Sequence, residues 1–181
     1  GSNKKKALKK MESLYDPLIK KGATFLPTSR RGAEMIKYAS NAFLATKISY
    51  INEIANLCEK TGVDVEDISI GMGLDKRIGG RFLRPGPAYG GSCFPKDTKA
   101  ITVTGDLYGT DLSIIKSVIK SNSKRKMLLV HRIKRILLNK IKNKKITVLG
   151  VTFKPNTDDM RQSSSLLMIP YLHKKGAIIN Y

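Results

Sequence analysis

The sequence contains little cysteine, no tryptophan and few acidic residues, and these shortages exclude several kinds of protein. Its 181 residues include two cysteines, Cys58 and Cys93, and 14 acidic residues against 34 basic ones. Two cysteines are too few for a disulfide framework, which favours a reducing compartment and predicts a cytoplasmic protein. His131 and His173 lie near neither another histidine nor a cysteine at ligand spacing, so no metal site is predicted.

Long apolar runs and a dinucleotide fingerprint are also absent. No run of about eighteen apolar residues occurs, so no segment is predicted to span a membrane. The first residues, with lysines at positions 4–6, have no apolar core and predict no export signal. No G-x-G-x-x-G occurs either. The hydrophobic fraction of 41% is nevertheless enough for a packed core.

The net charge of +20 predicts an anionic partner. Such a partner could be nucleic acid, an acidic membrane surface or a small molecule with a diphosphate. The basic clusters at 4–6, 9–10, 124–126 and 142–145 are not interleaved with aromatic residues. This pattern favours solvated helix faces over a surface for stacked bases, so no nucleic-acid partner is predicted. A basic helical nucleic-acid-binding module remains the alternative from another class.

The hydrophobic periodicity predicts a mainly α chain with two long helices, over 30–61 and 111–139. The first of these is apolar on most sides, which a small monomer can hardly bury. We therefore expect a partner subunit or a further domain against it. Shorter helices are predicted over 4–21 (with a break at Pro17), 65–72, 95–108 and 163–174, and strands over 23–26, 145–150 and 177–181.

The last strand, helix and strand form a β-α-β unit of about 30 residues, the size of one crossover. A lone parallel pair leaves its faces and edges open, so this unit looks like the start of a doubly wound domain. The first helix and strand look like the end of another. The predicted domains are therefore 1–29, a central helical domain over 30–142, and 143–181, with partial α/β (Rossmann-like) pieces on either side of the helical domain.

The stretch from Gly90 to Asp97 carries the most chemistry. Cys93 lies between a glycine pair and Pro95, which suits the first position of a helix. The helix dipole and the ammonium group of Lys96 both favour a thiolate, which is the nucleophilic form. A cysteine beside glycines also serves as a small residue in a tight turn, and local sequence alone favours that interpretation.

Other polar residues are placed to assist such a cysteine. Lys37 and Asn41 share a helix face and can donate hydrogen bonds to an oxyanion, although a snorkelling lysine and a packing asparagine fit the spacing as well. Asp97 can position a water or accept its proton, or simply favour the helix dipole. The arginines of the 73–92 loop can hold a diphosphate; they are Arg77, Arg81 and Arg84. Cys58 is expected in the core.

Three blocks of the sequence together resemble the nucleotide-sugar (UDP-glucose/GDP-mannose) dehydrogenase family. They are residues 33–47, the stretch from Arg77 through the Cys93 motif to Asp97, and residues 153–161 (Phe-Lys-Pro-Asn-Thr-Asp-Asp-Met-Arg). They follow the family's order and spacing over nearly the whole chain. The motif Cys-Phe-Pro-Lys-Asp favours the UDP-glucose branch of the family, with GDP-mannose or another nucleotide sugar as the alternative substrate.

The resemblance implies an NAD-dependent, four-electron oxidation of UDP-glucose to UDP-glucuronate, as in polysaccharide biosynthesis. It implies that Cys93 forms a thiohemiacetal and then a thioester, that Lys37 and Asn41 handle the alkoxide and oxyanion, and that Asp97 assists the water. The resemblance further implies that the UDP-sugar is bound by Arg77 (across a subunit interface), by the loop from Arg84 through Tyr89 to Gly90, and by Phe153 and Lys154. It implies that NAD is bound by Lys96 and Arg161.

The resemblance also implies a homodimer through the long central helix. The family's N-terminal domain, with its glycine-rich NAD loop and catalytic glutamate, has no counterpart in these residues. The chain is therefore expected to be inactive alone and to bind NAD poorly. A purely structural dimerisation fragment would share the long helix, and only a role for Cys93 in the parent enzyme distinguishes the two interpretations.

Overall fold

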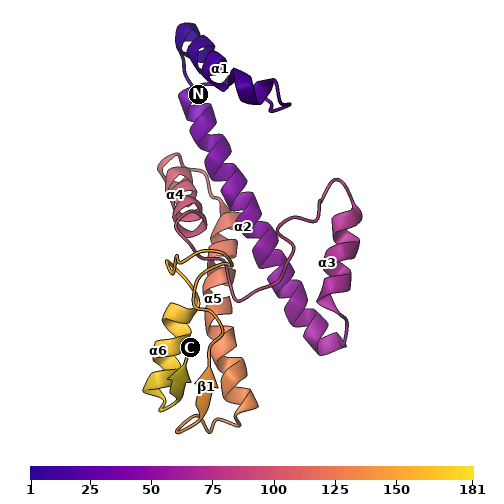
Figure 1. Cartoon of the computed structure of the whole chain (residues 1–181), viewed down its shortest axis with the longest axis vertical. Coiled ribbons are helices and arrows are strands. Elements are labelled where there is room, and N and C mark those ends of the chain that lie inside the picture. Colours follow the sequence, from indigo (N-terminus) through magenta and orange to yellow (C-terminus); the bar gives the residue numbers. More distant parts are fainter. The chain divides into compact units, whose positions relative to one another are not determined.

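The computed structural model describes all residues, Gly1–Tyr181, and is mainly helical (Figure 1). The chain divides into two compact units, Gly1–Ser40 and Asn41–Tyr181. No helix is both long and apolar enough to cross a bilayer. The elements in chain order are α1 (Lys5–Ile19), α2 (Arg30–Thr61), α3 (Val65–Leu74), α4 (Phe94–Leu107), α5 (Ser113–Ile136), β1 (Lys145–Thr147), α6 (Ser165–Lys174) and β2 (Ile178–Asn180).

The first unit contains α1 and the first turns of α2. The Ser29 hydroxyl accepts a hydrogen bond from the Gly32 amide at 3.0 Å, which caps α2 as the sequence predicts. Two predictions here are wrong. Residues 23–26 form no strand, because no other strand of this unit pairs with them. Helix α1 continues through Pro17 to Ile19, since a proline so near the end removes only one helical hydrogen bond.

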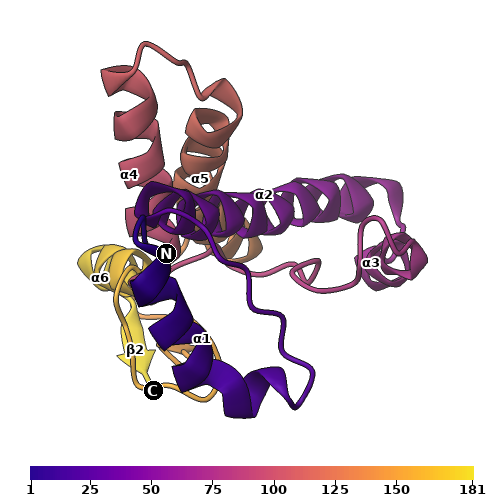
Figure 2. The ribbon, with the colours of Figure 1, turned by 90° about the horizontal axis from the view of Figure 1, so that it is seen from above.

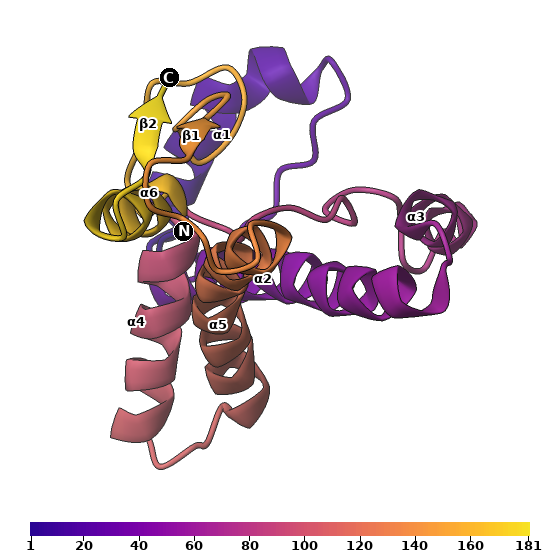
Figure 3. The ribbon, with the colours of Figure 1, turned by 90° about the horizontal axis from the view of Figure 1, so that it is seen from below.

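The second unit is built on α2, α4 and α5. Helix α2 has the predicted bounds and is followed by Gly62, whose positive φ of 72° ends it. Helix α4 lies alongside the first half of α5, as Figures 2 and 3 show from opposite sides. A core cluster of Ala45, Tyr89 and Val118 joins α2, the loop before α4, and α5. This packing places the start of α4 beside α2.

The C-terminal part forms the predicted β-α-β unit. Strands β1 and β2 pair in parallel, with Lys145 opposite Ile178, and α6 makes the crossover (Figure 3). A second core cluster, Ile141, Leu172 and Ala177, lies under them, with Ile133 of α5 packed against it. The strands are shorter than the predicted 145–150 and 177–181, because a two-stranded sheet gives each strand only one hydrogen-bonding neighbour.

The other boundaries are close to those predicted. Asp64 caps α3 by accepting a hydrogen bond from the Glu66 amide at 2.8 Å. Helix α4 begins one residue earlier than expected, so Pro95 occupies its second position and Cys93 is its N-cap. Helix α5 begins two residues later than expected and ends three residues earlier, followed by Leu138 and Asn139 at positive φ.

Candidate active site

Cys93 is an exposed thiol at the start of a helix. It precedes α4 as the N-cap residue, and its Sγ lies 3.6 Å from the Ser92 hydroxyl oxygen. The first amides of a helix carry partial positive charge, so this position favours an anionic group such as a thiolate or an oxyanion. Because the side chain is exposed, a dissolved reagent or substrate reaches it directly.

A buried carboxylate lies one helical turn beyond this cysteine. The Asp97 amide donates to the Cys93 carbonyl at 2.8 Å, and the Asp97 residue is 3% exposed. The Asn41 amide nitrogen donates to the Asp97 carboxylate at 2.5 Å, and the Lys96 ammonium lies 3.3 Å from the other carboxylate oxygen. The structure therefore brings Asn41 of α2 and Asp97 of α4 together, and their catalytic roles stay predictions.

Glycines make the loop before Cys93 fit closely against a segment of the C-terminal part. The Gly91 amide donates to the Arg161 carbonyl at 2.7 Å. A Cβ at Gly91 would lie 2.8 Å from the Phe153 ring, and one at Gly90 would lie 2.7 Å from the Gln162 carbonyl oxygen. Only glycine permits this approach, so the pair brings the 84–92 loop against the 153–162 segment.

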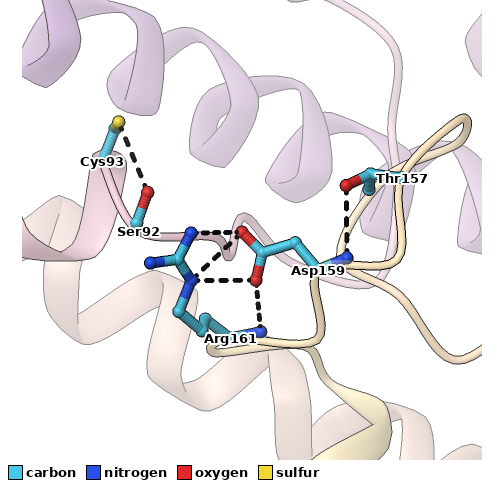
Figure 4. A network of polar contacts seen from close by, with 5 residues as sticks. All are labelled: Ser92, Cys93, Thr157, Asp159 and Arg161. Carbon is cyan, nitrogen blue, oxygen red and sulfur yellow. Dashed lines mark hydrogen bonds and ion pairs between the residues drawn. The ribbon is translucent and has the colours of Figure 1, made fainter.

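Arg161 presents a guanidinium near Cys93 (Figure 4). Asp159 holds it with bonds of 3.0 Å to Nε and 2.8 Å to Nη2. The Asp159 side chain is the main cause of the raised pKa of Arg161, and the charge of Cys93 adds to it. In return, the side-chain and backbone hydrogen bonds from Arg161 lower the pKa of Asp159. The pairing orients the guanidinium while leaving it open to solvent.

A pocket of about 500 Å³ joins the 84–92 loop to the C-terminal part. Pro87 and Ala88 line one side, and Phe153 and Lys154 line another. The Lys154 ammonium lies 5.4 Å from the centre of the Phe153 ring, an arrangement that offers a flat apolar face and a positive charge together. The pocket opens near the carboxyl end of β1, where ligands of parallel sheets bind.

The other predicted residues lie in different surroundings. The Tyr89 side chain is buried in the core, and this burial raises its pKa against the opposing effect of a hydrogen bond with Thr98. Arg84 is exposed. Arg77 is also exposed and pairs with Asp75 of its own loop, Nη2 to Oδ2 at 2.6 Å. Lys37 lies in the first unit, one helical turn before Asn41 in α2. The substrate-binding roles of Tyr89, Arg84 and Arg77 and the catalytic role of Lys37 stay predictions.

Sequence reasoning missed two buried asparagines that hold the 84–92 loop. The Asn52 side chain accepts from the Gly86 amide at 2.8 Å, and that of Asn122 accepts from the Tyr89 amide at the same distance. A partial signal existed for Asn52, which follows Ile51 and precedes Ile54 on a long apolar helix, but none for Asn122, which lies between Ser121 and Ser123.

These features define a helical domain that carries an exposed cysteine at a helix start, joined to a β-α-β unit. Residues 31–124 match the central domain of the UDP-glucose/GDP-mannose dehydrogenase family, and residues 147–181 match its UDP-binding domain. The chain belongs to this family.

Named relatives agree with this assignment. The chain is 46% identical to the UDP-glucose 6-dehydrogenase of Rickettsia felis over 179 residues, 99% of this chain and 40% of the relative. It is 48% identical to a UDP-glucose 6-dehydrogenase of Bacillus subtilis, over 93% of this chain and 37% of the relative. A solved UDP-glucose dehydrogenase from Pyrobaculum islandicum superposes with a TM-score of 0.88 at 36% identity, over 99% of this chain and 40% of that one. The chain thus spans about two fifths of the length of these relatives.

Proposed function

We propose that this chain is the cysteine-bearing part of an NAD-dependent enzyme that oxidises UDP-glucose to UDP-glucuronate. The observation that carries the proposal is the exposed Cys93 at the start of α4, with the buried Asp97 carboxylate one turn beyond it and Asn41 bonded to that carboxylate. The names of the relatives supply the substrate, and the geometry of Cys93 supplies a nucleophile for the second half of a four-electron oxidation.

The chemistry requires two oxidations of the same carbon. In the first, the C6 alcohol loses a proton and a hydride to become an aldehyde, and Lys37 and Asn41 would stabilise the alkoxide. The Cys93 thiolate then forms a C–S bond to the aldehyde carbon, and the carbonyl oxygen becomes the thiohemiacetal oxyanion. Loss of the second hydride gives a thioester.

Water completes the reaction by attacking the thioester carbon. The C–S bond breaks, Cys93 leaves as a thiolate, and the sugar leaves as a carboxylate. Asp97 would orient this water or take its proton, a role supported by its position one helical turn from Cys93 and its bond from Asn41.

Lys96 and Arg161 suit the phosphates of NAD; two NAD+ molecules, bound in turn, would accept one hydride each. Their side chains are 70% and 68% exposed, and both lie close to Cys93 in the chain or in space. Two cations at an open edge fit a pyrophosphate. The sequence contains no G-x-G-x-x-G, so this chain alone is expected to bind NAD weakly and to produce no NADH with UDP-glucose.

The UDP moiety would occupy the pocket beside Phe153 and Lys154. Lys154 supplies a cation for a phosphate, and Pro87 and Ala88 of the 84–92 loop also line the pocket. Arg84, at the start of the loop, is exposed and free of local secondary structure. Gly90 would contribute through its backbone, whereas Tyr89, whose ring is in the core and whose amide and carbonyl both bond Asn122, would act by shaping the loop.

A homodimer through α2 is part of the proposal. Four large apolar side chains recur every seven residues along this helix and are about half exposed or more: Ile36, Phe43, Tyr50 and Leu57. A stripe of this kind is typical of a helix that packs against another helix. In such a dimer, Arg77 of one subunit would reach the UDP-sugar of the other. Replacing Phe43 and Tyr50 with glutamate should yield a monomer in sedimentation velocity.

Alkylation of Cys93 tests the proposed function. Iodoacetamide labelling of the 181-residue chain, followed by mass spectrometry of the Cys93 peptide, is expected to slow about threefold or more in saturating UDP-glucose. GDP-mannose, and glucose with UMP, serve as matched controls that should have less effect. Equal labelling rates with and without UDP-glucose would contradict the proposal.

The same alkylation assay distinguishes the two candidate sugars, and a separate oligonucleotide-binding assay tests the nucleic-acid alternative. Stronger protection by GDP-mannose than by UDP-glucose would assign the GDP-mannose branch of the family. A basic nucleic-acid-binding module predicts instead that the chain binds an oligonucleotide with an affinity that falls steeply with salt and is unchanged in Cys93→Ala.

A further inference from the structure

The 84–92 loop has no regular secondary structure, and buried side chains of two helices bond its backbone. The Gly86 amide donates to the Asn52 side chain at 2.8 Å, and the Gly86 carbonyl accepts from Arg125 Nε at 3.0 Å. Farther along, the Tyr89 amide donates to Asn122 Oδ1 at 2.8 Å, and the Tyr89 carbonyl accepts from Asn122 Nδ2 at 3.0 Å. The loop thus takes its shape from α2 and α5 rather than from its own sequence.

The Asn122 side chain bonds both the backbone N–H and the backbone C=O of Tyr89, as a neighbouring β-strand would. Only a side-chain amide has the donor and the acceptor that this pattern requires, since aspartate lacks the donor and serine is too short to reach both groups. Asn122 is 6% exposed and Tyr89 is 5% exposed. Loss of the amide would therefore leave a buried N–H and a buried C=O without partners, which is costly.

The same face of α5 also holds the segment against which the loop packs. Lys126 lies one turn beyond Asn122, and its ammonium donates to the Gln162 carbonyl at 2.7 Å. Gly90 packs on that same carbonyl, and the Gly91 amide donates to the neighbouring Arg161 carbonyl. Helix α5 therefore fixes both walls of the pocket, the 84–92 loop through Asn122 and the 153–162 segment through Lys126.

We infer that Asn122 is a positioning residue for the nucleotide-sugar site, because its amide sets the backbone of the 84–92 loop that leads to Cys93. The inference rests on the proposed function, and it assigns the loop's substrate-binding conformation to a side chain on α5 that need not touch the substrate. From the next turn of α5, Lys126 bonds Gln162 of the 153–162 segment, against which the loop packs.

The decisive variant is Asn122→Asp in the 181-residue chain. At neutral pH an aspartate carboxylate still accepts from the Tyr89 amide but faces the Tyr89 carbonyl without a donor. Protonation restores a donor, so the defect should be reversed in acid. Ser121→Ala is the matched control, because the Ser121 hydroxyl bonds Glu53 of α2 at 2.5 Å and makes no bond to the loop.

Two measurements report on each variant. Hydrogen exchange of peptides covering 86–92 reports on loop order without any ligand. The second measurement is the ratio of Cys93 alkylation rates with and without UDP-glucose, which cancels changes in the thiolate fraction. For Asn122→Asp at neutral pH, we expect faster exchange and an apparent UDP-glucose affinity about tenfold weaker, with recovery once the pH is low enough to protonate the introduced carboxyl group. Ser121→Ala should match the wild type in both measurements.

The outcomes separate the inference from the proposed function. Equal protection by UDP-glucose in wild type and Asn122→Asp, or no recovery in acid, overturns the inference and leaves the function standing. No protection in the wild type contradicts the proposed function, and the inference fails with it. If Asn122→Asp does not fold, Asn122→Ser, which keeps a single hydrogen bond, replaces it. This variant should show faster exchange and weaker UDP-glucose affinity, both to a smaller extent. Wild-type behaviour of Asn122→Ser would equally overturn the inference.

Discussion

The two cysteines show how the same side chain acquires different chemistry in two regions of this protein. Cys93 precedes α4 in an exposed loop, with Asp97, Lys96 and Arg161 nearby. Cys58 lies within α2 and is 6% exposed, so it acts as a small apolar side chain of the core. Position relative to a helix end and to solvent, rather than residue type, decides which thiol is available as a nucleophile.

Selective alkylation is the largest expected difference. In the folded chain, Cys93 should react with iodoacetamide at least about a thousandfold faster than Cys58, because Cys58 reacts only when the core opens. Quenched time courses with mass mapping of the two peptides measure the ratio. In concentrated urea the two rates should become similar, and a ratio near one without urea would abolish the distinction.

The surroundings of Cys93 depend on the fit of Gly91 against Phe153. Gly91→Ala should lower the free energy of unfolding by about 3 kcal/mol, because a Cβ combines an unfavourable positive φ with overlap on the ring. Gly79→Ala is the control, since Gly79 has a similar φ but open space around it, and its cost should be about 1 kcal/mol. Urea titrations measure both, and equal losses would show that the ring contact contributes nothing.

Replacing each cysteine with serine should give a smaller difference between the two positions, measured as the change in the free energy of unfolding. Cys58→Ser should lower the free energy of unfolding by about 1–2 kcal/mol, because it buries a hydroxyl in the core. Cys93→Ser should change it by less than about 0.5 kcal/mol, since the side chain is exposed. Urea titration monitored by circular dichroism provides both values. A larger loss for Cys93→Ser would reverse the assignment of core and surface.

Acid should change the stability of the fold only slightly through the ion pair of Asp159 and Arg161 near Cys93. Hydrogen bonds from Arg161 lower the pKa of Asp159, so this pair stabilises the fold above the ordinary carboxyl pKa and the stabilisation is lost as the pH falls through the lowered value. Arg161→Gln should raise the pKa of Asp159 towards 3.8, as measured by NMR titration. Asp75, whose pKa is lowered by Arg77, should titrate unchanged in that variant, and a parallel shift there would indicate a general effect.

Much of the helical structure follows from local signals. The apolar periodicity and the cap at Ser29 predict α2, and Gly62 predicts its end, because each is a property of neighbouring residues. The strand predicted over 23–26 fails for the opposite reason. A strand exists only when another strand accepts and donates its hydrogen bonds, and local sequence does not report whether one is present.

The candidate site divides in the same way. Cys93, Asn41 and Asp97 were selected as candidates through the resemblance of three sequence blocks to a family, and the bond between Asn41 and Asp97 was not predicted. The sequence did not predict that Tyr89 turns its ring into the core, or that Asn52 and Asn122 hold the loop. These contacts join residues more than thirty positions apart, so only packing establishes them.

By itself, the sequence determined the helices and the β-α-β unit and marked Cys93 as the candidate nucleophile through its resemblance to a family, since periodicity, capping and motifs are properties of short stretches. The tertiary structure decided which thiol is exposed, what holds the 84–92 loop, and that the loop and the 153–162 segment share a pocket. The physical reason is that a buried amide hydrogen bond or a close glycine contact joins residues far apart in the sequence, so it forms only when the fold brings them together.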